Sequence, residues 1–411
     1  MPSTWSCRLC SADLDTTFVD LGASPPCQSF LTREQLSEPE ITYPLHVYVC
    51  AECLLVQLPA HVDAREVFDD YAYFSSYSTS WVEHARRYVD QAVPRLRLTP
   101  ASLVVEVASN DGYLLQHVLD RGLRALGVEA ADNVAEVARG RGVPTETCYL
   151  DASAGQRLAA EHGPASLVVA NNVLAHVPDL HGFVAGLRAL VADDGWVTVE
   201  FPHLLRLVEG RQFDTMYHEH YSYLSLLTAT RALSAGGLAV VDVEELSTHG
   251  GSLRLWVRPA EVAGEPTPAL GRVLQDERRA GLHELAGHRG FEAAVLEVKR
   301  GLLTFLLEAR VRGSSVAGYG APGKGNTLLN HCGVRADLLP YTVDRNPYKH
   351  GRFLPGSRIP VLPPEVLTER QPDYVLVLPW NLRDEITAQL AHVRSWGGRL
   401  VVAVPQLAIL P

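Results

Sequence analysis

Short apolar runs that end in a polar residue recur through the middle of this chain. Residues 103–105 form one such run and lead into Glu106, and residues 125–128 form another that ends at Glu129. Between them, apolar positions across 113–119 recur mostly every three or four residues. Runs of the first kind are typical of buried parallel strands, and the second spacing is typical of a helix. A strand–turn–helix–strand order that ends in an acid predicts the first half of a doubly wound α/β sheet.

The patterning continues and predicts the rest of this domain. An apolar run before Asn171 predicts a third strand, and a turn signal at 193–195 precedes a fourth. Two later apolar segments joined through His249 predict a closing antiparallel hairpin, from which His249 either reaches the crevice at the strand ends or is solvated. The predicted elements are strands over 166–170, 196–201, 238–243 and 252–257, and helices over 81–89, 180–190 and (as a long helix or a helix pair) 271–308.

The last hundred residues repeat the α/β pattern. A strand that ends at Tyr319 is followed by a glycine-rich turn over 320–327, which opens a helix. Its spacing is not that of a Walker loop, because Lys324 is followed by a glycine. Free N–H groups at a helix start, together with a lysine, still favour an anion. Tyr319, Lys324 and Asn326 are therefore candidate substrate-binding residues in a second Rossmann-like domain, with a purely structural turn as the alternative. Further strands are predicted over 341–346, 373–381 and 399–404.

The loop after the first central strand indicates which nucleotide ligand this sheet takes. Ala108 and Ser109 stand where the G-x-G-x-x-G of dinucleotide enzymes has glycines, so the loop suits an adenosyl ligand without phosphates better than NAD. A carboxylate such as Glu129 at a strand's carboxyl end can accept hydrogen bonds from ribose hydroxyls. The E-x-x-x-N-D-G run resembles the first motif of class I S-adenosylmethionine-dependent methyltransferases; an ordinary strand–turn–helix is the alternative. The candidate cofactor-binding residues are Glu106, Ala108, Asn110, Gly112, Glu129 and Asn171.

Four cysteines near the start of the chain form two C-x-x-C pairs with 39 residues between them. Two such knuckles complete a tetrahedral set for zinc, and four thiolates leave no open coordination position. The spacing therefore predicts a structural zinc ion that takes no part in the chemistry. A redox role is less suited, because neither pair opens a thioredoxin-like unit. The predicted ligands are Cys7, Cys10, Cys50 and Cys53.

Length and charge limit the classes of partner. A chain of 411 residues holds two or three domains. The formal net charge of -11 argues against a nucleic-acid partner, which needs a basic surface, and favours a small-molecule substrate. No apolar run is long enough to span a membrane, and no signal peptide is recognisable, so we expect a cytoplasmic protein, either a monomer or a homodimer.

Two polar segments are the richest in candidate chemistry. In the segment 214–223, a histidine next to Glu219 suits a general base whose tautomer and basicity the carboxylate sets. A metal site and a surface loop with chance histidines are the alternatives. The segment 68–77 interleaves phenols with serines, so it either lines a polar pocket or packs as core. Tyr77 and Tyr221, from these two segments, are candidate substrate contacts, as is His249.

Taken together, the motifs resemble the family of nucleotide-sugar C-methyltransferases of deoxysugar and antibiotic biosynthesis. The resemblance rests on the paired C-x-x-C, E-x-x-x-N-D-G, D-x-x-Y-x-E-H, H-G-G and G-Y-G-A segments and covers essentially the whole chain. It implies an α/β protein with an N-terminal zinc-binding module (1–70), a central class I, Rossmann-like methyltransferase domain with a helical connector (71–310) and a C-terminal Rossmann-like substrate-binding domain (311–411).

The resemblance also implies a reaction. Family members transfer a methyl group from S-adenosylmethionine to the carbon next to the keto group of a dTDP-linked sugar. His220 would be the base that removes a proton from that carbon; Glu219 and Tyr217 match neighbours in the same motif, and Tyr73 and His176 are further matches. Ala108 departs from the glycine of some members.

Other functions are compatible with the same sequence. An O-methyltransferase would use the same histidine on a hydroxyl, and a C-methyltransferase of this architecture could act on another natural-product intermediate. A non-catalytic protein with two nucleotide-binding folds is the alternative outside the enzymes.

Overall fold

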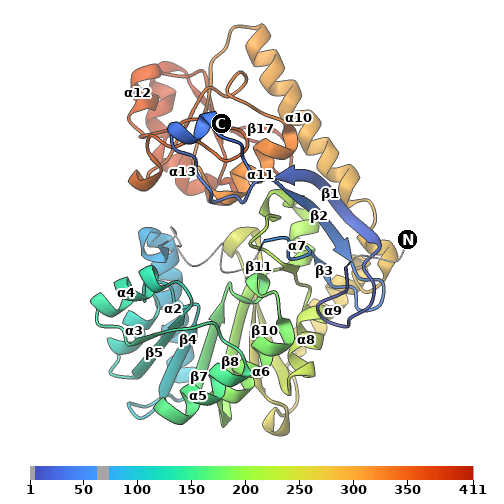
Figure 1. The fold of residues 1–411 in the computed structure, drawn as a ribbon, viewed down its shortest axis with the longest axis vertical. Coiled ribbons are helices and arrows are strands. Elements are labelled where there is room, and N and C mark those ends of the chain that lie inside the picture. Colours follow the sequence, from blue (N-terminus) through green and yellow to red (C-terminus); the bar gives the residue numbers. More distant parts are fainter. Residues whose placement is uncertain (1–4, 63–73, 411) are drawn as a thin grey trace.

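The computed structural model describes residues 5–62 and 74–410, which form three sheets (Figure 1). Tyr73, a sequence-predicted catalytic residue, lies outside the described residues. No helix in the described part of the chain is both long and apolar enough to cross a membrane.

The central sheet has the predicted doubly wound order with a closing hairpin. Its strands run β10-β11-β8-β7-β4-β5-β6, and β4 to β8 pair in parallel, whereas β10 and β11 are antiparallel. The strands are β4 (Leu103–Val107), β5 (Arg124–Glu129), β6 (Thr145–Thr147), β7 (Ala165–Asn171), β8 (Val191–Pro202), β10 (Leu238–Leu246) and β11 (Ser252–Pro259). The helices are α2 (Thr79–Arg95), α3 (Leu115–Leu119), α4 (Asp132–Gly140), α5 (Ala152–His162), α6 (Leu180–Leu190), α7 (Leu204–Glu209), α8 (Leu226–Ala235) and α9 (Pro268–Arg279).

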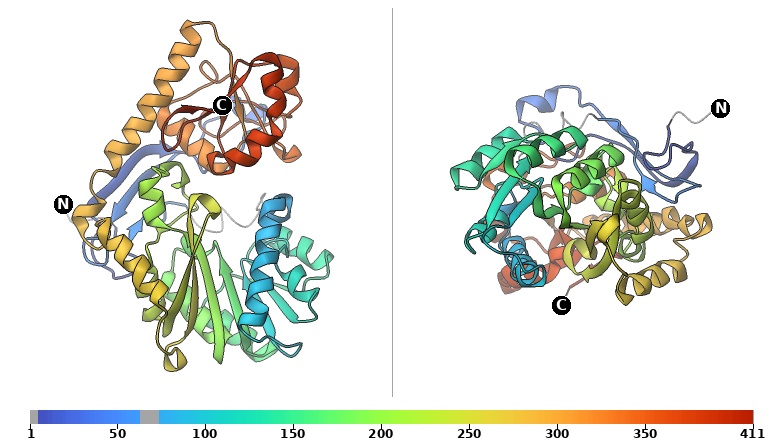
Figure 2. Two further views of the ribbon diagram at one scale, coloured as in Figure 1. Left: turned by 180° about the vertical axis from the view of Figure 1, so that it is seen from behind. Right: turned by 90° about the horizontal axis from the view of Figure 1, so that it is seen from below.

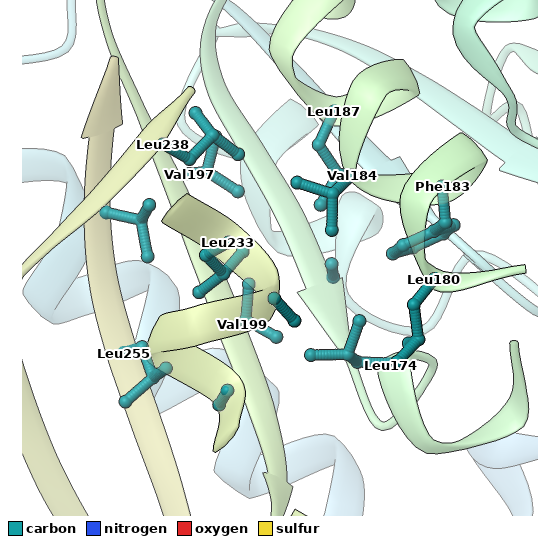
Figure 3. Close-up of a cluster of buried hydrophobic side chains, with 14 of the residues drawn as sticks. Leu174, Leu180, Phe183, Val184, Leu187, Val197, Val199, Leu233, Leu238 and Leu255 are labelled. Carbon is teal, nitrogen blue, oxygen red and sulfur yellow. The ribbon is translucent and has the colours of Figure 1, made fainter. Parts of the chain in front are cut away.

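Apolar periodicity explains how α6 and the sheet pack. Leu180, Phe183, Val184 and Leu187 recur at the spacing of one helix face and are buried. They face Val197 and Val199 of β8, with Leu233, Leu238 and Leu255 alongside (Figure 3).

Two sequence-predicted boundaries in this domain were wrong. The turn predicted at 193–195 lies inside β8, as an irregularity in its pairing with β7. A side chain at Gly195 would come within 2.8 Å of the Ala165 carbonyl oxygen, so the glycine serves close strand approach rather than a turn. The helix predicted over 81–89 begins earlier, because the Ser78 side chain accepts from the Trp81 N–H, and it continues to Arg95.

The N-terminal module is not a separate unit. Its sheet, in the order β1-β2-β3-β9, takes its last strand from the segment that follows His220. The bounds are β1 (Thr16–Ser24), β2 (Tyr43–Val49), β3 (Val56–Gln57) and β9 (Ser222–Tyr223). The module also reaches the C-terminal domain, since Leu31 pairs with Phe353 and Arg358 donates to the Leu36 carbonyl.

The C-terminal domain is a second α/β unit, as predicted. Its sheet runs β14-β13-β12-β15-β16-β17, parallel except for β17, and the short strands β14 and β17 carry no clear sequence signal. The strands are β12 (Val316–Tyr319), β13 (Thr342–Val343), β14 (Val361–Leu362), β15 (Tyr374–Val377), β16 (Arg399–Val402) and β17 (Ala408–Ile409). The helices are α10 (Phe291–Val311), α11 (Gly323–Cys332), α12 (Val366–Arg370) and α13 (Arg383–Gln389).

The long helix α10 joins the domains. Both views of the ribbon place it beside β1 and the C-terminal domain (Figures 1 and 2). Its buried face, including Leu302 and Leu306, belongs to one apolar core with β1, β2 and the C-terminal sheet. The structure has the helix pair of the two predicted alternatives. The same apolar core includes Leu204 and Leu207 of α7, so α10 packs against both the central and the C-terminal domain.

Candidate active site

Three of the candidate cofactor residues lie at the carboxyl ends of neighbouring parallel strands. Glu106, Glu129 and Asn171 stand on β4, β5 and β7, which are adjacent in the sheet. The Glu129 carboxylate accepts the Asn110 N–H at 2.8 Å and the Ala131 N–H at 3.0 Å. Burial raises the pKa of Glu106 and of Glu129. This is the edge at which doubly wound sheets bind nucleotides.

The residues at this edge fit an adenosyl ligand. The Asn171 side-chain oxygen and both amide atoms of Asn172 are buried with no hydrogen-bond partner in the described part of the chain. Asn172 also has a left-handed backbone, with φ 54°. Buried polar groups without partners indicate a missing ligand or water. Asn172 was not among our sequence candidates. It could have been predicted, because Asn171 and Asn172 form a polar pair directly after a buried strand.

The loop after β4 is folded by its left-handed residues rather than by the glycine pattern. Ala108, Asn110 and Gly112 have φ values of 55°, 50° and 79°. The Asn110 side chain accepts the Ser75 N–H at 2.8 Å, so this side chain holds the neighbouring segment while its backbone N–H holds Glu129. A side chain at Gly112 would come within 2.8 Å of Val143.

Replacing Ala108 by glycine tests the strain in this loop. A Cβ atom disfavours the left-handed region, so we expect A108G to raise the free energy of unfolding by about 0.5–1 kcal/mol, measured by chemical denaturation. The matched control is Ala160→Gly on the exposed side of α5, where the same change should lower stability by about 1 kcal/mol. Equal destabilisation by both changes would contradict strain at position 108.

Two imidazoles and a phenol form what we call the histidine cluster: His176, Tyr217 and His220. The His176 and His220 ring centroids are 4.6 Å apart and nearly perpendicular, and the Tyr217 ring lies 4.0 Å from that of His220. The His220 Nδ1 atom is 2.7 Å from the Thr215 carbonyl oxygen, and the His176 Nδ1 atom is 2.8 Å from the Glu219 carbonyl oxygen. Each Nδ1 must carry the proton to donate, which leaves Nε2 as a basic lone pair.

Burial keeps these imidazoles neutral. It lowers the pKa of His176 to about 4 and that of His220 well below 6.5, and the proximity of His176 lowers the pKa of His220 further. A neutral imidazole that is protonated at Nδ1 carries its lone pair on Nε2 and can accept a proton there at ordinary pH.

Our expectation that Glu219 orients His220 and raises its basicity was wrong. The Glu219 carboxylate accepts the Cys27 thiol at 3.3 Å, and burial raises its pKa to about 7. The carbonyl of Thr215, rather than a carboxylate, sets the tautomer of His220. Glu219 instead acts on His176, through its own backbone carbonyl.

The structure does not support a metal site in this segment. His218 points away from the cluster, with its Nε2 atom 3.2 Å from the Pro44 carbonyl oxygen. Among the residues that the structure describes, neither His218 nor His220 belongs to a group of three or more side chains placed to hold a metal ion.

The C-terminal domain brings a cation to the histidine cluster. Lys324 donates to Asn381 at 2.8 Å and lies over the Trp380 ring. Its charge helps lower the pKa of both His220 and His249. The helix that carries Lys324 is bonded to the segment of the cluster, because the Thr327 hydroxyl donates to the Met216 carbonyl at 3.0 Å. Trp380 in turn donates to Asp214 at 2.7 Å, and burial raises the pKa of that carboxyl to about 6.

The remaining candidates differ in position. His249 is half-buried, with its ring centroid 5.0 Å from that of Trp81. Tyr221 is completely buried, and its hydroxyl donates to the Val62 carbonyl. The Asn326 amide donates to the Cys27 carbonyl at 2.6 Å, which ties α11 to the N-terminal module. The Tyr221 hydroxyl is thus bonded within the protein, whereas the Asn326 side-chain oxygen is buried with no hydrogen-bond partner in the described part of the chain.

Two tyrosines lie elsewhere. Tyr319 lines a cavity of about 530 Å³ in the C-terminal domain, together with Arg345 and Gln389. Tyr77 is 62% exposed and shares a hydrogen bond with Tyr348 of the C-terminal domain, which raises the pKa of Tyr77.

The four cysteines of the C-x-x-C pairs converge as predicted. Their sulfur atoms all lie within 4.8 Å of one another, with Cys7 and Cys53 at 3.4 Å and Cys10 and Cys50 at 3.5 Å. Sulfurs arranged tetrahedrally about a zinc ion at ~2.3 Å lie roughly 3.8 Å apart, so the set fits zinc. The Gln57 amide donates to Cys7 at 3.0 Å, a contact that supports the ligand sphere.

Comparison with known proteins identifies the family. The chain is 37% identical to the C-methyltransferase NovU of Streptomyces niveus over 404 residues, which cover 98% of this chain and 96% of NovU. The chain belongs to this C-methyltransferase family. Three family models match it in order: a zinc-binding domain over residues 7–68, a methyltransferase domain over 81–243 and a C-methyltransferase C-terminal domain over 247–405.

Solved structures with a similar fold cover about half of this C-methyltransferase. The PH0226 protein from Pyrococcus horikoshii covers 48% of this chain and 99% of its own, at 12% identity and a TM-score of 0.37. Magnesium protoporphyrin IX methyltransferase from Synechocystis, with bound S-adenosylmethionine, covers 47% of this chain and 88% of its own, at 18% identity and a TM-score of 0.32.

The family membership confirms several predictions. This C-methyltransferase is an S-adenosylmethionine-dependent enzyme with an α/β fold, a zinc-binding cysteine cluster and a second C-terminal α/β domain. The residue roles within the site and the substrate remain predictions.

The lowered pKa values predict how turnover depends on pH. A base works in its neutral form, so activity is present above the pKa of His220 and is lost as pH falls through it. We expect the acid limb of kcat/KM from His220 to lie below pH 6.5, because its pKa lies well below that value. The measurement is a pH–rate profile of the wild type and of Glu219→Gln, since the variant removes any titration of Glu219. An acid limb of kcat/KM at or above pH 6.5 in both proteins would contradict the expectation.

Proposed function

We propose that this C-methyltransferase methylates the carbon next to the keto group of a dTDP-4-keto-deoxysugar, with His220 as the general base. The observation that carries the proposal is the neutral pair of imidazoles, each held at Nδ1 by a backbone carbonyl. Such a pair has basic Nε2 atoms and lies beside a phenol, and the charge of Lys324 acts on His220, which suits proton removal from a carbon next to a carbonyl group.

The proposed chemistry follows from these groups. His220 Nε2 takes the proton from the carbon, and the electron pair of the broken C–H bond forms an enolate whose charge lies largely on oxygen. In this proposal, Tyr217 and Lys324 donate to that oxygen and stabilise its charge. His176 is no donor in this tautomer, because its proton is on Nδ1; it accepts a sugar hydroxyl or relays the proton instead. S-adenosylmethionine supplies the methyl group, and positioning of the two reactants accelerates the transfer.

The proposed place for the nucleotide portion is the C-terminal domain. The cavity of about 530 Å³ beside Tyr319 contains the side chain of Arg345, which can pair with phosphate oxygens. Lys324 stands in the first turn of α11, and this helix contacts the segment of the histidine cluster through the bond from Thr327 to the Met216 carbonyl. This arrangement supports a ligand that extends from phosphates in one domain to a sugar in the other.

Solvent exchange tests the proposal. The enzyme is incubated in D₂O with S-adenosylhomocysteine and a panel of dTDP-4-keto sugars, and deuterium incorporation is followed by mass spectrometry. We expect incorporation at one ring carbon, because enolisation precedes methyl transfer. No incorporation into any keto sugar, despite tight binding of S-adenosylhomocysteine, would overturn the proposal and favour O-methylation or a substrate that is not a sugar.

A further inference from the structure

Arg8 lies inside the first zinc knuckle, between Cys7 and Cys10, yet its side chain points out of that knuckle. Its guanidinium donates to the Pro178 carbonyl at 3.2 Å and to the Leu58 carbonyl. It also lies over the Tyr221 ring, 5.4 Å from the centroid. Three groups on three segments of the chain thus meet at one side chain.

Two of the three partners of Arg8 belong to segments that carry a histidine of the cluster, and the third is bonded to one of these segments. Pro178 stands two residues after His176, and Tyr221 directly follows His220. The Leu58 N–H donates to the Tyr221 carbonyl at 3.0 Å, which links the third partner to the His220 segment.

The two histidine segments are also bonded to each other. The Tyr221 N–H donates to the Ala175 carbonyl at 2.8 Å. The His176 ring is held by the carbonyl of Glu219. The guanidinium of Arg8 donates to Pro178 on the first segment and to Leu58, which is itself bonded to Tyr221 on the second. Because its donors have a rigid fork geometry, these contacts restrain the separation of the two segments.

A second contact from the same knuckle acts in the same place. The His181 Nε2 atom is 2.9 Å from the Leu9 carbonyl oxygen, so the first turn of α6 is also tied to the knuckle. The segment that follows His176 is therefore bonded to the first zinc knuckle at two points, Pro178 and His181.

We propose that Arg8 is a positioning residue for the two imidazoles, and that the zinc module holds His176 and His220 at their working separation through it. The inference rests on the proposed function, because only that function makes the separation of the two histidines important for catalysis. The separation itself can be tested without knowing the substrate. It gives the zinc module a role in the geometry of the base, although the metal takes no part in the chemistry.

The test compares substitutions at two arginines that each contact a knuckle. Arg8→Met keeps the apolar stem and removes the fork, and Arg8→Lys keeps only the charge. The control is Arg231→Met, because Arg231 donates to the Cys53 carbonyl of the second knuckle at 2.8 Å and to neither histidine segment. For each full-length holoenzyme, we would measure zinc content, S-adenosylhomocysteine affinity and the ¹⁵N histidine NMR titration.

We expect Arg8→Met to retain zinc and bind S-adenosylhomocysteine as the wild type does, while the Nε2 signals and titrations of His176 and His220 shift. We expect kcat to fall about 10- to 100-fold with little change in KM for the cofactor, since small misplacements of a reacting group cost this much. Arg8→Lys should give a partial effect, and Arg231→Met should leave both histidines unchanged.

Two results would overturn the inference. Unchanged histidine spectra in Arg8→Met would show that the fork does not position the imidazoles. Loss of zinc in both Arg8 variants would instead make Arg8 part of the fold of the knuckle. The NMR readout needs no substrate, so it decides this inference even where no keto sugar exchanges its proton and the proposed function fails.

Discussion

His220→Asn should abolish both methyl transfer and solvent exchange while leaving S-adenosylmethionine bound. Asparagine keeps an amide N–H that can still reach the Thr215 carbonyl, 2.7 Å from the imidazole Nδ1, but it has no basic nitrogen. A general base contributes ~10²–10⁴-fold, so the rate should fall about 10³-fold. Steady-state turnover and calorimetric titration with the cofactor measure the two effects separately.

The same segment offers a matched control. His218 is buried, but its Nε2 atom faces the Pro44 carbonyl rather than the cluster. His218→Asn therefore removes an imidazole two residues from the base and should retain turnover within about 10-fold, with some loss of thermal stability. Equal loss of turnover in both variants would show that the effect at position 220 comes from disturbing the segment.

Cys50→Ser should remove zinc and unfold the N-terminal sheet. The Cys50 sulfur is buried 3.5 Å from that of Cys10, and β2 and β3 flank its knuckle. Structural zinc sites contribute ~10–16 kcal/mol of apparent binding free energy, which is far more than the stability of most domains. We expect metal content to fall well below one equivalent and the melting temperature to drop by more than about 10 °C.

A substitution at a different cysteine is the control that distinguishes the effect of losing zinc from the effect of losing any thiol. Cys148 is half-buried and lies outside the cysteine cluster, so Cys148→Ser should keep full zinc content and the wild-type melting temperature within about 2 °C. Full zinc content in Cys50→Ser, measured by atomic emission, would contradict the four-thiolate site. Because β3 pairs with β9 after His220, we also expect Cys50→Ser to lose turnover.

Most of the fold could be predicted from the sequence because local patterns determine it. Apolar runs that end at Glu106, Glu129 and Asn171 locate the carboxyl edge of the sheet, and the C-x-x-C spacing locates the knuckles. The family resemblance located the segment of His220. These features depend on residues near one another in the chain, for which periodicity and motif spacing are informative.

The contacts within the site could not be predicted in the same way. The partner of the Glu219 carboxylate is Cys27, 192 positions away in sequence, and Lys324 joins the histidines from another domain. The tautomer of His220 depends on a backbone carbonyl, which any residue at position 215 would provide. The identity of a residue does not show which backbone carbonyl its side chain will contact. The sequence therefore indicated the adjacent Glu219 as the partner of His220 instead of the Thr215 carbonyl.

The pairing of β3 with β9 has a consequence for the order in which the chain folds during synthesis. Gln57 pairs with Ser222, so the N-terminal sheet has an open edge until more than half of the chain has left the ribosome. Such long-range pairing forms late because its loop-closure entropy is large. The cysteines can bind metal as soon as Cys53 emerges, and a metal-bound knuckle would hold the early segment compact meanwhile. The edge of the N-terminal sheet that closes late is the one beside His220, so we expect the segment of the base to reach its final position only after β9 has been synthesised.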